Sequence, residues 1–216
     1  SLTLRMVNNL GMLLYTQGKL DEAEPLVRRA LEGLERTFGP DHKDTLTTVG
    51  NLGRLFQEQG KLNEAEPLCR RALEGSERTL GPDHKDTLIS VNNLGLVLQE
   101  QGKLNEAEPL YRRALEGRER TLGPDHSDTL SSVNRLGVFL RAQGKLNEAE
   151  PLFRRELEGR EKTLGVDHSD TLNSVNNLGS LLEDQGKLNE AEPLFRRALE
   201  GQERTLGPDH SDTLSS

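Results

Sequence analysis

One short motif returns along this chain at a fixed spacing. The tetrapeptide Gln-Gly-Lys-Leu begins at Gln17 and begins again at Gln59, 42 residues later. The other copies begin at Gln101, Gln143 and Gln185, and the five His recur with the same period. A period of this length predicts a solenoid or array, in which each unit buries its apolar face against its neighbours.

Each repeat divides into two helical segments. In the second repeat, apolar residues such as Val49 and Leu52 recur at spacings of three and four within 45–59, which predicts an amphipathic helix, called helix A. The segment 62–80 has the same spacing and predicts helix B, which Gly81 should end. The sequence therefore predicts an all-α chain that forms one array. The predicted repeats are 3–44, 45–86, 87–128, 129–170 and 171–212, with 213–216 as the start of a truncated sixth repeat.

The composition limits the kind of partner. The formal net charge is −8 and the pI is about 5.3, which argues against nucleic acid and against an anionic membrane as partners. No apolar run approaches the ~20 residues that a membrane-spanning helix needs. Cys69 is the single cysteine, so no intrachain disulfide can form, and we expect an intracellular, cytoplasmic location.

These residues resemble the tetratricopeptide repeat, and more closely its 42-residue form in kinesin light chains and related arrays. The residues of the second repeat that carry the resemblance are Val49, Leu52, Gly53, Phe56, Ala65 and Ala72. The resemblance implies an antiparallel helix pair per repeat, stacked into an α-solenoid with a right-handed superhelix and helix A on its concave side. At Gly53, helices A and B should approach closely. Glu156 replaces the second Ala of helix B in the fourth repeat, where we expect looser or shifted packing.

Glu and Arg alternate every four residues on the outer face of helix B, as at Glu66, Arg70, Glu74 and Arg78. Each such pair stabilises a helix by only about 0.2–0.5 kcal/mol. We expect these pairs to keep a solvated helix face helical and soluble, rather than to form a functional charge track.

The sequence contains no catalytic constellation. Each repeat offers one His, as at His42, and the next His lies a whole helix pair away, so no metal site with four converging ligands is expected. We expect each His to be a turn or helix-start residue. Cys69 stands where other repeats carry Val, Tyr or Phe, which indicates a buried core residue. The chain is predicted to need no cofactor and not to be an enzyme.

Asn residues before the Leu-Gly of helix A are the candidate binding residues. An amide has donors and an acceptor, so a row of Asn can bind the backbone of an extended peptide whatever its sequence. Resemblance to peptide-binding tetratricopeptide domains implies this role for the second residue of each pair. The alternative is that each Asn hydrogen-bonds to a neighbouring helix or loop and fixes the repeat geometry. The candidate residues are Asn8, Asn9, Asn51, Asn92, Asn93, Asn134, Arg135, Asn176 and Asn177.

Specificity should come from helix A positions that differ between copies. One such row contains Gln57, Gln99 and Arg141, which complete the candidate peptide-binding set. Arg135 and Arg141 lie a turn and a half apart on the predicted helix. They are the residues that we expect to bind an acidic side chain or a carboxylate terminus of a peptide.

Two functions remain open from the sequence. The first is a scaffold that binds a protein or an extended peptide in the helix A groove. The second is a structural spacer or self-associating rod without a peptide ligand. Neither end carries a polar capping helix, so end-to-end self-association is possible. The last helix B is expected to leave Leu194, Phe195 and Ala198 uncovered.

Overall fold

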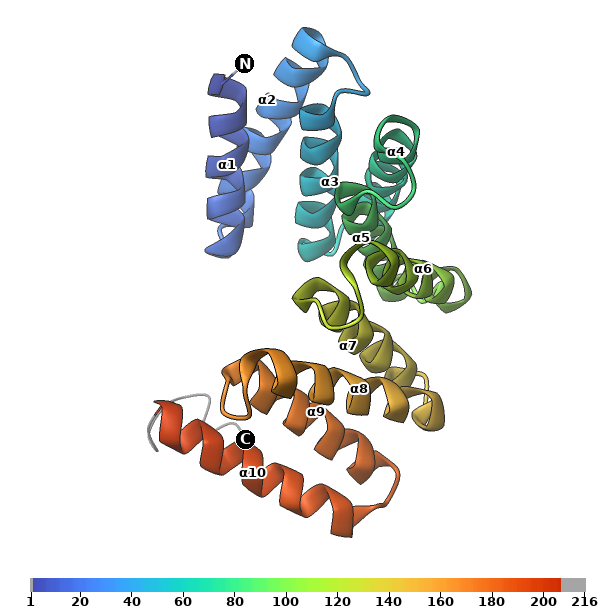
Figure 1. Ribbon diagram of the computed structural model, residues 1–216. Helices are drawn as coiled ribbons and strands as arrows, with labels where there is room; N and C mark the ends of the chain where they lie inside the picture. Colours follow the sequence, from blue (N-terminus) through green and yellow to red (C-terminus); the bar gives the residue numbers. More distant parts are fainter. Residues whose placement is uncertain (1, 207–216) are drawn as a thin grey trace. The chain divides into compact units, whose positions relative to one another are not determined.

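The computed structural model describes residues 2–206 of the 216-residue chain, and within this range all regular structure is α-helical (Figure 1). The helices are α1 (Leu2–Thr16), α2 (Leu20–Phe38), α3 (Lys43–Glu58), α4 (Leu62–Leu80), α5 (Lys85–Glu100), α6 (Leu104–Leu122), α7 (Ser127–Ala142), α8 (Leu146–Leu164), α9 (Ser169–Asp184) and α10 (Leu188–Leu206). Helix A is thus an odd-numbered helix and helix B an even-numbered one. The all-α prediction is confirmed, while the start of a sixth repeat at 213–216 lies outside the described residues.

Helix B has the predicted ends and helix A does not. The second helix B, α4, runs from Leu62 to Leu80, and Gly81 follows it with φ 93°, a left-handed conformation that glycine adopts without strain. The N–H of Gly81 donates to the carbonyl of Glu77, as in a helix C-terminus. The second helix A, α3, begins two residues before the predicted start at residue 45, because the turn residue His42 caps it.

The His of each described repeat is an N-cap. Nδ1 of His42 accepts a hydrogen bond from the backbone N–H of Asp44 at 3.2 Å, which satisfies one of the free donors in the first turn. The same bond is made by His84, His126 and His168 to Asp86, Asp128 and Asp170. This confirms the expected helix-start role for these four His, whereas His210 lies outside the described residues.

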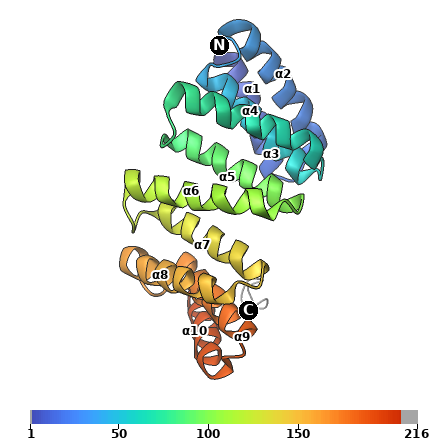
Figure 2. The same ribbon diagram turned by 90° about the vertical axis from the view of Figure 1, so that its right-hand side faces the viewer.

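The helices form two compact units, one ending at Gly117 and the other beginning at Arg118. In the first unit each helix from α1 to α5 packs on the next, and consecutive helices run antiparallel (Figure 2). In the second unit α7 packs on α8, α8 on α9, and α9 on α10. Small residues allow the close contacts within each helix pair.

Two glycines of the second repeat show how close these contacts are. A Cβ on Gly53 of α3 would lie 2.8 Å from Sγ of Cys69 on α4, which confirms the close approach expected there. A Cβ on Gly75 of α4 would lie 2.3 Å from Cδ2 of Leu46 on α3, so this glycine is also required by packing. Cys69 is 1% exposed, and burial raises the pKa of its thiol to about 12, so it is a core residue as predicted.

The fourth repeat fills its core differently from the others. Glu156, in place of Ala, is 1% exposed, and its carboxylate accepts a hydrogen bond from Nε of Arg160 at 2.7 Å. Burial raises the pKa of Glu156, opposed by the Arg160 guanidinium. A buried ion pair within α8 therefore accompanies the missing Ala.

Some helix B carboxylates form ion pairs with the following repeat in addition to the predicted pairs within one helix. Glu66 binds Arg70 at 2.9 Å on its own helix and also Lys103 of the next repeat at 2.7 Å. The same contact to the following repeat joins Glu24 to Lys61 and Glu150 to Lys187. Hydrogen bonds from Lys103, opposed by burial and supported by Arg70 and Gln101, lower the pKa of Glu66 to about 2. These Glu therefore connect adjacent repeats.

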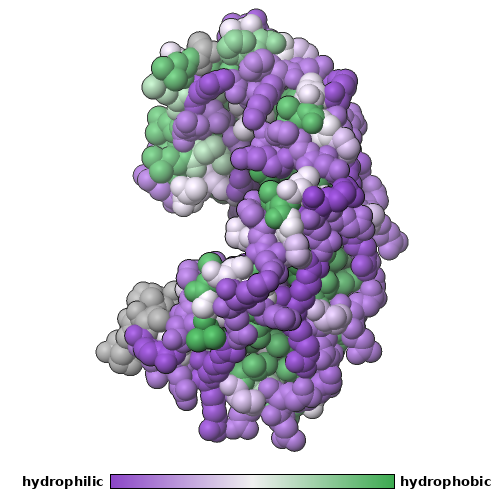
Figure 3. Space-filling view, in the orientation of Figure 1, coloured by the Kyte–Doolittle hydropathy of each residue, from purple (hydrophilic) through white to green (hydrophobic). Residues whose placement is uncertain are grey.

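Apolar side chains of α1 are exposed at positions that are buried in the second repeat. Met6, Leu10 and Leu13 are 58%, 49% and 54% exposed, and Figure 3 shows apolar colour gathered over α1. Ala198 of α10 is 1% exposed, so the expectation that it lies uncovered is wrong, because it packs in the interface of α10 with α9. No described helix combines the length and the apolar character that crossing a lipid bilayer requires.

Candidate functional site

The two Asn of a pair differ in exposure. Asn8 and Asn92, the first members of their pairs, are both 8% exposed, whereas Asn9 is exposed and Asn93 is half-buried. The first members Asn8 and Asn92 are therefore packed against the rest of the chain, and the second members Asn9 and Asn93 are the more accessible ones. In the first unit, helix A of one repeat contacts helix A of the next, and Asn8 lies on the side of α1 that faces α3.

Several candidate Asn join neighbouring helices. Nδ2 of Asn51 on α3 donates to Oδ1 of Asn8 on α1 at 3.2 Å, and Asn177 on α9 donates to Asn134 on α7 at the same distance. Nδ2 of Asn92 donates to the carbonyl of Leu88 in its own helix at 3.0 Å. These hydrogen bonds are the kind of contact that would fix repeat geometry.

Asn93 has no such bond. In the repeat before, the equivalent Asn51 donates to Asn8, which lies 43 residues earlier in the chain. The residue 43 positions before Asn93 is Gly50, which has no side chain to accept a hydrogen bond. The Asn93 amide makes no hydrogen bond within the described part of the chain. It is therefore available to a ligand.

The variable row on helix A also connects repeats. Nε2 of Gln57 donates to Oε1 of Glu100 at 2.6 Å, and Nε of Arg141 donates to Oδ2 of Asp184 at 2.5 Å. Gln99 instead accepts a hydrogen bond from the Tyr111 hydroxyl at 2.8 Å. These bonds were not predicted from the sequence. They could have been, because the bonded residues, such as Gln57 and Glu100, are complementary and lie 43 positions apart.

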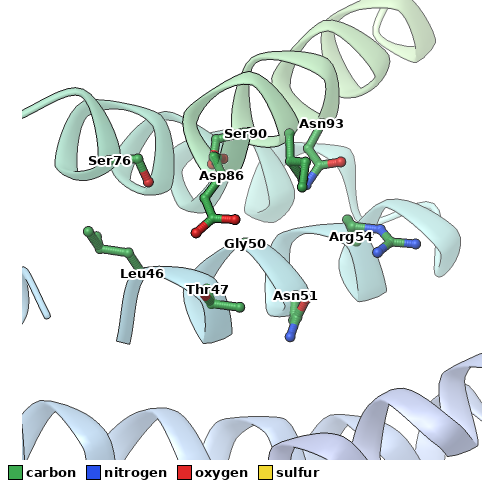
Figure 4. A pocket seen from close by; sticks show the side chains of 10 residues that line it. Leu46, Thr47, Gly50, Asn51, Arg54, Ser76, Asp86, Ser90 and Asn93 are labelled. Atoms are coloured by element: carbon green, nitrogen blue, oxygen red, sulfur yellow. The ribbon is translucent and has the colours of Figure 1, made fainter. Parts of the chain in front are cut away.

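Two hollows open between successive A helices of the first unit. One, of about 170 Å³, lies between α1 and α3 and includes Asn8 and Asn9 in its lining. The other, of about 80 Å³, lies among α3, α4 and α5 and includes Asn51 and Asn93 (Figure 4). Figure 4 shows Asp86 of α5 directed toward Gly50 of α3. The lining of this second hollow is Leu46, Thr47, Gly50, Asn51, Arg54, Ser76, Asp86, Ile89, Ser90 and Asn93.

The structure thus brings some candidate residues together and leaves others apart. Asn8, Asn9 and Asn51 lie around adjoining hollows of the first unit, with Asn93 at the second one. In the second unit, Asn134 and Asn177 bond to each other, while Arg135 is exposed. Among residues 2–206, no three His, Cys, Asp or Glu side chains form a group that could hold a metal ion.

The Tetratricopeptide repeat family model matches this chain five times, in overlapping segments. The matched residues are 2–68, 50–120, 87–162, 128–204 and 170–216. The chain belongs to the tetratricopeptide repeat family. No protein of curated function matches it in sequence. Members of the family are generally non-enzymatic scaffolds, and this tetratricopeptide chain has the architecture typical of protein–protein interaction.

Solved structures share the tetratricopeptide fold. A kinesin light chain protein of Podosopora anserina with nearly identical TPR-like repeats is 25% identical, with a TM-score of 0.83 over 94% of this chain and 97% of that one. BtubC (BKLC) of P. vanneervenii is 24% identical, with a TM-score of 0.83 over 94% of this chain and 81% of that one. The resemblance to kinesin light chain repeats that the sequence indicated is confirmed.

Proposed function

We propose that this tetratricopeptide scaffold binds an extended peptide or partner segment in the groove lined by helix A. The observation that carries the proposal is the unbonded amide of Asn93 at the edge of the hollow between α3 and α5. A side-chain amide in this position can donate to a peptide carbonyl and accept from a peptide N–H. The hollow beside it supplies space for a side chain of the bound segment.

Other features support the same proposal. A Rap protein with this fold, 14% identical and with a TM-score of 0.73, has been solved in complex with Competence and Sporulation Factor. This likeness extends to the fold alone, and it supports the general ability of such a fold to hold a partner. The single cysteine supports an intracellular setting for that partner, and the net charge of −8 favours a protein over a nucleic acid.

The two Arg candidates for an anionic group differ. Arg141 is already bonded to Asp184, so its charge is largely compensated within the chain. Arg135 is exposed and forms no ion pair within the described residues. We therefore favour Arg135 over Arg141 as the contact for a carboxylate of the bound segment.

A peptide-array screen followed by fluorescence anisotropy on the strongest peptide tests the proposal. Asn93→Ala should weaken binding about 3- to 10-fold, the loss of one or two neutral hydrogen bonds. Asn63→Ala, on the exposed start of α4, is the matched control and should leave affinity unchanged. Binding of no peptide, or equal affinity of the Asn93 and Asn63 variants, would remove the groove as the site.

The second candidate function is a self-associating rod, and the exposed apolar face of α1 favours it. Leu10 and Leu13 are about half exposed, whereas their equivalents Leu52 and Leu55 are buried. Sedimentation velocity over a wide concentration range distinguishes the two functions. Association that Leu10→Gln abolishes, together with a groove that binds no peptide in the array, would favour the rod.

A further inference from the structure

The hollow among α3, α4 and α5 contains a buried acceptor. Oδ2 of Asp86 is inaccessible to solvent and accepts no hydrogen bond within the described part of the chain. The ammonium of Lys43 lies 3.0 Å from this oxygen, without the alignment of a hydrogen bond, and is 57% exposed. A buried carboxylate oxygen without a hydrogen bond is costly, so a donor entering the hollow would be stabilised.

Equivalent positions in other repeats meet an Arg from the chain itself. In the fourth helix B, Nη1 of Arg160 lies 2.9 Å from Oδ2 of Asp170, the equivalent of Asp86. In the third, Nη1 of Arg118 donates at 2.7 Å to Oγ of Ser132, which is equivalent to Ser90. In two repeats, therefore, the space between helix B and the following helix A holds a guanidinium group.

At Asp44, the equivalent of Asp86 one repeat earlier, the Arg comes from the preceding helix A and not from helix B. Nε of Arg5 on α1 donates to Oδ2 of Asp44 at 2.6 Å. The residue equivalent to Arg5 one repeat later is Thr47, which is too short to reach Asp86 in the same way. The Asp86 carboxylate therefore lacks both kinds of Arg contact, the one made by Asp44 and the one made by Asp170.

Two small residues leave the place beside Asp86 open. Ser76 stands where the next two repeats have Arg118 and Arg160. Gly50 stands where most repeats have Asn, and a Cβ there would meet nothing closer than Ala72 at 3.8 Å. The resulting hollow of about 80 Å³ exceeds the ~30 Å³ that one water occupies in the liquid.

We propose that this hollow is a subsite for the guanidinium of an Arg side chain on the bound segment, with the Asp86 carboxylate as its counter-charge. The inference rests on the proposed function, since the segment reaches the hollow from the helix A face. A guanidinium has five donors in a planar fork, so it can meet the Asp86 carboxylate, the Ser90 hydroxyl oxygen and the Asn93 carbonyl oxygen together. The exposed Lys43 side chain can turn into solvent when the guanidinium enters.

A small probe tests the subsite apart from peptide binding in general. N-acetyl-arginine amide is titrated into the ¹⁵N-labelled chain, with N-acetyl-citrulline amide as the uncharged isostere. The Arg probe should shift the backbone resonances of Ser76, Asp86 and Ser90 in a saturable way. The citrulline probe should bind at least ~5-fold more weakly, because charge-assisted hydrogen bonds are about twice as strong as neutral ones.

Two substitutions fill the hollow with groups that the chain already uses in the same position. Ser76→Arg introduces the residue of the third and fourth repeats, and Ser76→Leu introduces the Leu34 of the first. Both should abolish saturable binding of the Arg probe. Asn63→Arg adds the same charge at the exposed start of α4 and should leave binding unchanged.

The outcomes separate this inference from the proposed function. Equal binding of the arginine and citrulline probes, or binding that survives in both Ser76 variants, would overturn the subsite. Array peptides that bind through Asn93 without any preference for Arg would also overturn it, while leaving the proposed function in place. An array without binders, together with a saturable Arg probe, would remove the proposed function and keep a guanidinium site.

Discussion

Glu156 and Arg160 form an ion pair on one side of α8, with 2.7 Å between Oε1 and Nε and with side chains only 2% and 10% exposed. In the second repeat the same two positions hold Ala72 and Ser76. The contact between helix B and the following helix A is thus made by an ion pair in the fourth repeat and by two small, uncharged residues in the second, although the two repeats are otherwise closely similar in sequence.

Removing one half of this pair should be far worse than removing both. Arg160→Ser leaves Glu156 buried without its counter-charge and should lower the free energy of unfolding by about 3–5 kcal/mol. Glu156→Ala combined with Arg160→Ser recreates the Ala72 and Ser76 of the second repeat and should lie within about 1 kcal/mol of the parent, or be more stable. Urea unfolding followed by circular dichroism measures both, and a double variant as unstable as Arg160→Ser would contradict this account.

Gly50 interrupts the row of Asn that joins neighbouring A helices. Gly50→Asn should let its new carbonyl oxygen accept from Asn93, as Asn8 accepts from Asn51. The replacement should raise the free energy of unfolding by about 0.5–1.5 kcal/mol, from the hydrogen bond and from the low helix propensity of Gly.

Thermal unfolding checks this prediction, and Gly50→Ala is its control. Ala gains helix propensity but cannot bond to Asn93, and a Cβ at this position has room. The gain from Gly50→Asn should be larger in the parent background than in the Asn93→Ala background, where only the gain in helix propensity remains. A gain of equal size in both backgrounds would therefore contradict the bond to Asn93.

The fold was largely predictable because its determinants are local. The limits of α4 follow from the spacing of apolar residues between Leu62 and Leu80 and from the Gly after them. The start of α3 was placed two residues late because the apolar spacing begins only at Leu46, after the first turn that His42 caps through its ring nitrogen.

The candidate site was predictable only in outline. Helical spacing placed Asn8 on helix A, but its burial depends on the neighbouring α3, which no single-helix pattern describes. The hollow at Asp86 depends on two small residues, Gly50 and Ser76, that belong to different helices and are far apart in the sequence. Such a feature appears only once the helices are packed against one another.

The bonds between repeats made by helix B carboxylates should give the stability an acid dependence. The pKa of Glu66 falls from 4.5 to about 2 on folding, so this group stabilises the fold fully above about pH 4.5 and loses that contribution as the pH falls toward 2. Glu66→Gln should therefore lower the melting temperature at pH 7 and flatten its fall between pH 4.5 and 2. Glu74→Gln on the same helix is the control, because Glu74 is exposed and forms no ion pair within the described residues, and an identical pH profile for the two variants would count against the contact with Lys103.

The His N-caps can be tested by replacing His84 with Asn, which keeps a hydrogen-bond acceptor, and with Ala, which does not. Nδ1 of His84 accepts from the N–H of Asp86 at 3.2 Å, a bond that the Asn side-chain oxygen can also accept and that Ala cannot. His84→Ala should therefore lower the free energy of unfolding by about 1 kcal/mol, whereas His84→Asn should be neutral or slightly stabilising. Urea unfolding at pH 8 measures the difference. Equal losses for Ala and Asn would mean that the ring contributes through its bulk, and that the hydrogen bond to Asp86 is not what fixes the start of α5.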